Sequence, residues 1–423
     1  MSKTGFTRAD ILVPKAELLE KWCTVACDQF TSEPEYWDEV IKIIENKPSA
    51  FNITFPEIYL EDGDAFERII SINDTMQRYL NEGLFREYKN RYIYIERKLF
   101  ESGVRAGIIG AIDLEMYDFS KGSQSLVRAT EDTVVERIPP RVKIRKNAPI
   151  ESPHIMMLID DEKGTVIEPL AKKKTAMTNI YDNVELMRQG GKISGWLIND
   201  KDADRIDAAL EALADRAAFE KKYGAPDKGT LLFAMGDGNH SLATAKQCYE
   251  DLKAEIGEEA AKAHPARFAL VELVNLHSPA LTFKPIHRAA FDVDVDKLIA
   301  EMTEELGLVE GKVEGMQSFV YFKKRKDYVV SITKPTSEIT VGSLQNFLDG
   351  YLKRNGGKID YIHGKFVAIA HSRKDENISF VLPDVYKSDL FPTVIKDGAL
   401  PRKTFSMGNA WDKRYYLECR KIK

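Results

Sequence analysis

Long apolar runs are absent from this chain of 423 residues. No stretch approaches the ~20 consecutive apolar residues that a membrane-spanning helix needs. The N-terminus also lacks the basic start and apolar core of a secretory signal. We therefore expect no membrane partner and a cytoplasmic location.

Cysteine is scarce, with four in the whole chain. So few cysteines in so long a chain do not form a disulfide framework, which favours a reducing compartment. Cys23 and Cys27 lie one helical turn apart and could pair on a metal ion. No second Cys or His pair follows at a metal-ligand spacing, so buried thiols are the simpler interpretation of both.

An excess of positive charge is also missing, because 61 Lys and Arg residues stand against 66 Asp and Glu, a formal net charge of −5. A general nucleic-acid-binding protein needs a basic surface, so we expect no nucleic-acid partner. The remaining composition, 43% hydrophobic and 30% charged, is ordinary for a soluble globular protein. A chain of this length predicts two or three domains.

The most informative stretch that is present runs from Leu231 to Ser241, with the sequence LLFAMGDGNHS. Apolar residues typical of a buried strand lead into Gly236-Asp237-Gly238, and good helix formers follow. A strand that turns through glycines into a helix brings free backbone N–H groups and the positive end of the helix dipole to one point, where phosphate binds well. The same pattern occurs where glycines only permit a sharp reversal of the chain, and both interpretations stay open.

The periodicity of the remaining chain predicts helices and strands in alternation, which indicates a mixed α/β fold with α+β portions. Strands are expected at residues 21–30, 91–99 and 105–114, and a hairpin at residues 155–159 and 165–170. Soft boundaries near residues 125 and 290 divide the chain into three regions, 1–125, 126–290 and 291–423.

Arginines gather in the polar segment 117–145, among them Arg128 and Arg141. Pro139 and Pro140 predict that no helix crosses this segment. The planar guanidinium group suits bidentate recognition of phosphate or carboxylate. The alternative is that these arginines pair with neighbouring acidic side chains on the surface.

Two further positions could belong to a site. Arg402 and Lys403 lie in a loop, residues 400–408, that mixes cationic and hydroxyl side chains and could cover an anion or form a surface turn. His154 follows Pro153 at the entrance of an expected strand, where it is either catalytic or a histidine satisfied within the fold.

The run Asp237-Gly238-Asn239-His240-Ser241 resembles the Asp-Gly-His-His-Arg loop of the ParB/sulfiredoxin-like superfamily. The likeness to the DUF1015 family, an uncharacterised branch of that superfamily, extends over most of the chain. It is carried by residues 26–37 (ACDQFTSEPEYW), 128–131 (RATE), 137–141 (RIPPR), Pro153-His154 and the loop 400–408. The resemblance implies a ParB/sulfiredoxin-like core at 126–290, with additional N-terminal α/β and C-terminal α+β regions.

In this superfamily, sulfiredoxin and the archaeal free serine kinase use the loop to cradle nucleotide phosphates, and ParB binds and hydrolyses CTP. The loop here has no cysteine for sulfiredoxin chemistry, and no helix-turn-helix domain of the ParB kind is evident. The resemblance therefore implies phosphoryl transfer between ATP or ADP, with Mg²⁺, and a small hydroxylated metabolite, free serine or phosphoserine being the first candidate. A non-catalytic nucleotide or phosphometabolite sensor and a phosphate-ester or nucleotide hydrolase remain alternatives.

The resemblance also implies residue roles. The loop residues expected to bind phosphate are Gly236, Gly238, Asn239 and Ser241. Asp237 would hold Mg²⁺, and His240 would act on the phosphates. Glu33 or Glu35 would accept the proton of the substrate hydroxyl. Because Asn239 and Ser241 replace the first His and the Arg of the family loop, cations from elsewhere must offset the phosphate charge, and the candidates are Arg128, Arg141, Arg402 and Lys403.

Overall fold

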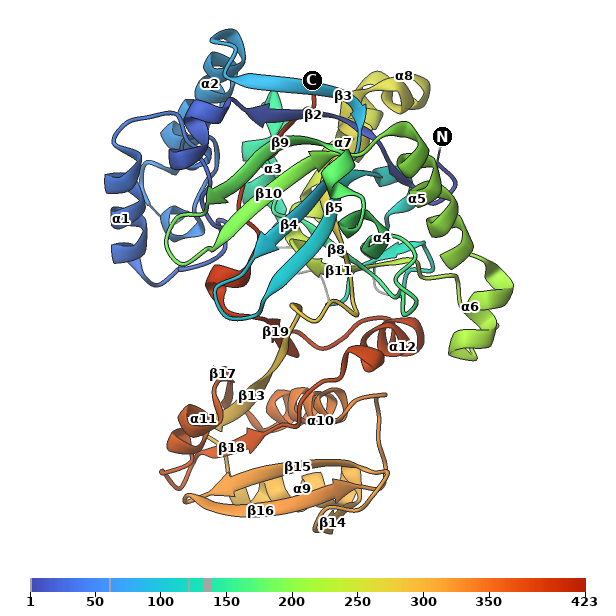
Figure 1. Cartoon of the computed structure of the whole chain (residues 1–423). Helices are drawn as coiled ribbons and strands as arrows, with labels where there is room; N and C mark the ends of the chain where they lie inside the picture. The colour runs from blue at the N-terminus through green and yellow to red at the C-terminus, as the bar shows by residue number, and fades with distance from the viewer. Residues whose placement is uncertain (1, 61, 121, 132–137) are drawn as a thin grey trace. The chain divides into compact units, whose positions relative to one another are not determined.

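The computed structural model describes residues 2–60, 62–120, 122–131 and 138–423 (Figure 1). These residues form two compact units, each described here by itself. The first comprises the described residues of 1–129, 133–282 and 408–423, and the second comprises Thr130, Glu131 and Phe283–Met407. No helix in the described ranges is long and apolar enough to cross a membrane. The boundaries expected near residues 125 and 290 stay a prediction.

The first unit is built around a mixed sheet to which nine described strands belong (Figure 1). In spatial order these are β6 (Val127–Arg128), β11 (Phe233–Asp237), β8 (Met156–Ile159), β12 (Phe268–Asn275), β5 (Val104–Asp113), β4 (Ile93–Lys98), β10 (Lys192–Leu197) and β9 (Thr178–Glu185), with β1 (Phe6–Thr7) also paired to β5. β11 runs parallel to β6 and antiparallel to β8, while β8 runs parallel to β12. Two small antiparallel pairs complete the unit, β2 (Ala9–Pro14) with β3 (Phe85–Arg91) and β7 (Ile150–Glu151) with β20 (Arg420–Lys421).

Both faces of this sheet are covered. Successive side chains of a strand point to opposite faces, and on β4 they enter two different hydrophobic clusters. Ile93 and Ile95 pack in the cluster that contains Trp22, whereas Tyr94 packs in the cluster that contains Phe233. The alternation that predicted a strand at residues 91–99 is therefore confirmed and has a physical cause.

Helices of the first unit supply these covers. They are α1 (Pro34–Ile44), α2 (Ala65–Asn81), α3 (Ile138–Lys146), α4 (Glu168–Ala171), α5 (Asp200–Leu213), α6 (Arg216–Tyr223), α7 (Asn239–Ile256) and α8 (Glu258–Ala263). Short 3₁₀ turns lie between them, at η1 (Ala16–Lys21), η2 (Ala50–Ile53), η3 (Glu57–Tyr59), η4 (Leu114–Met116), η6 (Lys174–Ala176), η7 (Pro265–Arg267) and η8 (Ala410–Asp412).

The second unit is an antiparallel sheet with helices. Its described strands, in spatial order, are β14 (Leu308–Glu310), β16 (Lys326–Ile332), β15 (Gln317–Lys323), β18 (Ile378–Val381), β13 (Phe283–Phe291) and β17 (Lys358–His363), with β19 (Phe405–Met407) also paired to β13. Its helices are α9 (Val295–Leu306), α10 (Thr340–Asn355), α11 (Lys365–His371) and α12 (Lys387–Asp397). The prediction of a mixed α/β fold is confirmed.

Three local predictions are wrong. Residues 21–30 form no strand, because their apolar side chains are buried in an irregular segment in which only Val25 makes a strand-like bridge, to Tyr415. Residues 165–170 form no strand either, and α4 occupies part of that segment with Pro169 in its first turn.

The third concerns the segment with Pro139 and Pro140, which begins α3 instead of excluding a helix. Proline fits the first turn of a helix because the N–H groups there have no intrahelical partner. Residues 132–137 of the same segment lie outside the described residues.

Candidate functional site

Gly238 makes the turn by which β11 leads directly into α7. Its φ of +77° lies in the left-handed region, and a Cβ atom here would lie 3.0 Å from the Cα of Ile155. Both the backbone conformation and the available space therefore require glycine. Gly238 has no side chain to cap α7, so the helix begins in the arrangement that lets first-turn N–H groups bind an anion. The predicted strand–turn–helix is confirmed.

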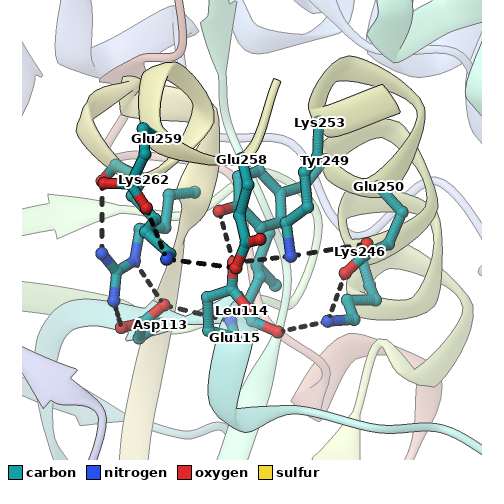
Figure 2. A network of polar contacts seen from close by, with 11 residues as sticks. Asp113, Leu114, Glu115, Lys246, Tyr249, Glu250, Lys253, Glu258, Glu259 and Lys262 are labelled. Atoms are coloured by element: carbon teal, nitrogen blue, oxygen red, sulfur yellow. Dashed lines mark hydrogen bonds and ion pairs between the residues drawn. The ribbon is translucent and has the colours of Figure 1, made fainter. Parts of the chain in front are cut away.

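The body of α7 is anchored by a polar network that Figure 2 shows. Tyr249 donates a hydrogen bond of 2.7 Å to Glu115 in η4, and Lys253 pairs with the same carboxylate at 2.7 Å. Lys246 donates to the carbonyl oxygen of Leu114 at 2.9 Å. These contacts fix the helix against the end of β5, and the position of its N-terminus is fixed with it.

Asp237, the last residue of β11, lies beside a lysine from the C-terminal segment. Its Oδ1 accepts a hydrogen bond from the Gly238 N–H at 3.0 Å, and its Oδ2 lies 3.5 Å from Nζ of Lys413. Buried arginines hold the backbone around Lys413, since Arg97 donates to its carbonyl oxygen and Arg105 donates to that of Asp412 at 2.9 Å. A fixed lysine thus adds positive charge next to the uncapped helix end.

His154 lies just before β8 and faces three side chains. Its Nδ1 is 2.8 Å from the hydroxyl of Tyr416, and its Nε2 is 3.5 Å from Oγ of Ser241 in the first turn of α7. The same Nε2 lies 3.8 Å from Oδ2 of Asp28. The sequence left open whether His154 is catalytic or is satisfied within the fold. Its contacts place it beside the loop between β11 and α7.

The Asp28 carboxylate is ionised at this position. Burial alone would raise its pKa, but the neighbouring His154, a hydrogen bond from Gln29 and the charge of Lys413 outweigh burial and lower the pKa below its usual value. The Gln29 amide donates to Oδ1 at 2.9 Å. Oδ2 therefore remains the oxygen that faces His154.

A buried ion-pair network lies behind His154 and is centred on Arg414. This guanidinium pairs with Glu272 at 3.0 Å and with Glu418 at 2.6 Å, and it donates to the carbonyl oxygen of Pro153 at 2.9 Å. Burial opposes its charge, but Glu418 and Glu272 raise the pKa of Arg414 above its usual value. Arg414 thereby ties the C-terminal segment to the residue that precedes His154.

The four cations proposed from the sequence make other contacts. Arg128 is buried and donates to the carbonyl oxygens of Ser125 at 2.9 Å and Gly229 at 2.5 Å. Both acceptor residues precede β11 in the chain, whereas the candidate loop follows β11. Burial lowers the pKa of Arg128 to about 10. Arg141 pairs with Glu57, whose backbone N–H donates to the carbonyl oxygen of Cys27.

Arg402 and Lys403 belong to the second unit. There Arg402 donates to the hydroxyl of Tyr361 at 2.7 Å, and the carbonyl oxygen of Lys403 accepts from Arg288 at 2.9 Å. The phosphate-binding roles proposed for these cations stay predictions.

The remaining predicted residues fall into two groups. Asn239 and His240 lie in the first turn of α7 and are half-buried. Oδ1 of Asn239 is buried and accepts no hydrogen bond from the described residues. Glu33 and Glu35, in contrast, lie at the start of α1 with exposed side chains.

Sequence reasoning missed Asp28, Lys413 and Tyr416. Asp28 lies inside the family-like run 26–37, and its place there was the available signal. Lys413 and Tyr416 had none, because they reach His154 and the loop only when the two ends of the chain pair. Tyr416 donates its backbone N–H to the carbonyl oxygen of Thr24 at 2.9 Å.

Fold and site together define a mixed α/β protein whose candidate site is an uncapped strand-to-helix turn beside a lysine and a histidine–aspartate pair. The model of the family described as "Protein of unknown function (DUF1015)" matches residues 8–351. The chain therefore belongs to the DUF1015 family, as the motifs indicated. No curated protein matches the chain.

Solved structures give a distant likeness. A conserved hypothetical protein from Pyrococcus furiosus is 12% identical, with a TM-score of 0.37 over 74% of this chain and 94% of that chain. A free serine kinase in complex with AMP is 11% identical, with a TM-score of 0.38 over 74% of this chain and 91% of that chain. SbnI with a C-terminal truncation, from Staphylococcus aureus, is 10% identical, with a TM-score of 0.27 over 42% of this chain and 65% of that chain. Scores this low transfer no activity to the chain.

Proposed function

We propose that the protein transfers a phosphoryl group between ATP or ADP and a small hydroxylated metabolite, at the turn between β11 and α7. The observation that carries this proposal is the uncapped N-terminus of α7 with Lys413 3.5 Å from Asp237. Backbone N–H groups and one lysine give the turn the positive character that a phosphate group requires. Positioning and charge neutralisation supply most of the rate in phosphoryl transfer.

The same turn fits Mg²⁺ held largely by a nucleotide. Oδ2 of Asp237 is buried and accepts no hydrogen bond from the described residues, so it offers one carboxylate oxygen. Mg²⁺ in such sites is commonly bound by one or two carboxylates together with phosphate oxygens. When bound, the ion would neutralise charge on the transferring phosphoryl group, while Lys413 and the α7 amides would hold the phosphate oxygens.

The acceptor is a small hydroxylated molecule, and the motif resemblance suggests free serine or phosphoserine as the first to test. Ser241 and His154 lie next to the helix end and give that side polar groups able to orient a hydroxyl. A nucleotide sensor and a phosphate-ester or nucleotide hydrolase would use the same turn. Only the sensor needs no acid–base group, so the presence of Asp28 beside His154 favours an enzyme.

Thermal-shift measurements with ATP, ADP, CTP and phosphoserine should first show binding, and a product assay should then separate the alternatives. A kinase gives a phosphorylated acceptor, a hydrolase gives free phosphate without one, and a sensor gives neither. His240→Ala should lower kcat/KM by about 10²-fold or more, as removal of a group that stabilises the transition state does. His264→Ala, remote in sequence from the loop, is the matched control, and an unchanged rate in His240→Ala would rule the site out.

A further inference from the structure

The position of the proton on His154 follows from its partner Tyr416. The Tyr416 hydroxyl accepts the backbone N–H of Cys27 at 3.1 Å, and burial raises the pKa of Tyr416 well above its usual value, so the group keeps its own proton. A buried hydroxyl proton requires an acceptor, and Nδ1 of His154 lies 2.8 Å away. In the neutral imidazole Nδ1 therefore accepts and the proton lies on Nε2. In the imidazolium form, whose charge lowers the pKa of Asp28, Nε2 carries a proton as well.

The Nε2–H group faces two oxygens that are both too far for a normal hydrogen bond. Ser241 Oγ lies at 3.5 Å and Asp28 Oδ2 at 3.8 Å, whereas an N–H···O bond usually spans about 2.7–3.2 Å. An oxygen atom of a ligand placed among these three atoms would satisfy them together. Ser241 belongs to the first turn of α7, so that oxygen would lie next to the proposed phosphate site.

We propose that Asp28 is the catalytic base and accepts the proton of the acceptor hydroxyl, with His154 and Tyr416 as positioning residues. This inference rests on the proposed function. The acceptor oxygen forms a bond to the terminal phosphorus of the nucleotide, and the bond from that phosphorus to the bridging oxygen breaks. The electron pair of that bond leaves with the nucleotide shortened by one phosphate, the diphosphate from ATP or the monophosphate from ADP. The proton of the hydroxyl passes to Oδ2 of Asp28. The base is then Asp28 and not Glu33 or Glu35, whose side chains are exposed at the start of α1.

The arrangement also defines the acceptor. The hydroxyl must receive a hydrogen bond from His154 Nε2–H and present its own proton to Asp28, which requires an alcohol with a free O–H group.

Kinetics of Asp28→Asn test this assignment, with ATP and ADP each labelled at the terminal phosphate and a panel of hydroxylated amino acids and plain alcohols. We expect kcat to fall by about 10²–10³-fold, as removal of a general base does, while the thermal shift produced by ATP is retained. Asp38→Asn, an exposed aspartate on α1, is the matched control and should keep wild-type kinetics. An active wild-type protein with an unimpaired Asp28→Asn variant overturns this inference alone, whereas a wild-type protein that transfers phosphate to no acceptor overturns it together with the proposed function.

The positioning residues are tested by rescue and by a measurement that needs no activity. His154→Gln keeps an N–H donor near the place of Nε2, so its kcat should stay within roughly tenfold of wild type, while His154→Ala should lose about 10²-fold with little change in KM. Equal kcat in His154→Gln and His154→Ala overturns the positioning role. In ¹⁵N-histidine NMR of the full chain, neutral His154 should show its proton on Nε2, and Tyr416→Phe should weaken that preference. A proton found on Nδ1 overturns the inference.

Discussion

A histidine–aspartate pair lies at each end of β8, where His154 precedes the strand and Asp160 follows it, but the contacts at the two ends differ. Before the strand, Nε2 of His154 lies 3.8 Å from Asp28 and 3.5 Å from Ser241. After the strand, Nε2 of His277 lies 2.6 Å from Oδ1 of Asp160, and the hydroxyl of Tyr223 lies 2.5 Å from Oδ2. The first pair lacks a close nitrogen–oxygen contact, and the second pair is closed.

The far end could have been taken for a metal site. Asp160, Glu162 and His277 offer ligand atoms within 4.8 Å of one another. Nζ of Lys222, however, lies 3.0 Å from both carboxylates and supplies the positive charge that an ion would bring. Residue types alone therefore do not separate a binding site from a structural cluster. The difference lies in whether the polar atoms already have close partners. That criterion favours a structural role for the Asp160 end and supports the proposed chemistry at the His154 end.

The largest effect is expected where the His154 end is held in place. Arg414→Met removes one charged partner from each of two buried carboxylates, those of Glu272 and Glu418, and breaking a buried ion pair on one side costs about 3–5 kcal/mol. Urea denaturation should show this loss. Arg216→Met, which breaks an exposed pair with Glu220, should cost about 1 kcal/mol or less. A similar small cost in both variants would mean that the Arg414 network does not hold the site.

Lys413→Met should change function without changing the fold. The side chain lies beside Asp237 with only 14% of its surface exposed, and loss of one charged donor to a phosphate group should weaken nucleotide binding or kcat/KM by about 10–10³-fold. Lys421→Met is the matched control, because Lys421 belongs to the same C-terminal segment as Lys413 and forms an exposed pair with Glu87 of β3. Equal nucleotide affinity in the two variants, measured by calorimetry, would remove Lys413 from the site.

The local half of this site could be predicted from the sequence, and the distant half could not. The turn at Gly238 follows from consecutive residues, since an apolar run, a glycine and helix formers each act on their own neighbours. Asp28 and Tyr416 come together because residues near the two ends of the chain pair with each other, Val25 bridging Tyr415. Such pairing depends on packing partners that no local pattern specifies.

The mispredicted segments have the same cause. Residues 21–30 include apolar side chains because Trp22 and Cys23 pack in a core. A periodicity argument interprets such an apolar run as a strand. Arginines suggested an anion site at Arg128, and that role stays a prediction. Two of its guanidinium nitrogens donate to the backbone carbonyl groups of Ser125 and Gly229. Composition indicates which chemistry a side chain offers, and only tertiary contacts decide where it is directed.

The smallest effect is expected at the closed end of β8, and its pH dependence has a definite sign. Burial opposes ionisation of Asp160, but hydrogen bonds from Tyr223, His277 and Lys222 outweigh it and lower the pKa. Its carboxylate therefore stabilises the fold above the unfolded-state pKa of about 3.9, and this contribution is lost as the pH falls through the lower pKa of the folded state.

Asp160→Asn should accordingly lower the free energy of unfolding by about 1–3 kcal/mol at neutral pH. The difference in this free energy between variant and wild type should become smaller below about pH 4. Urea denaturation over this pH range measures it, with Asp215→Asn as an exposed aspartate control. Phosphoryl transfer at neutral pH should remain within about twofold of wild type, because surface and structural clusters away from reacting atoms change activity little. Unchanged stability of Asp160→Asn together with lost phosphoryl transfer would reverse the comparison. Asp160 would then support the chemistry and not the fold, and close contacts would no longer mark a structural cluster.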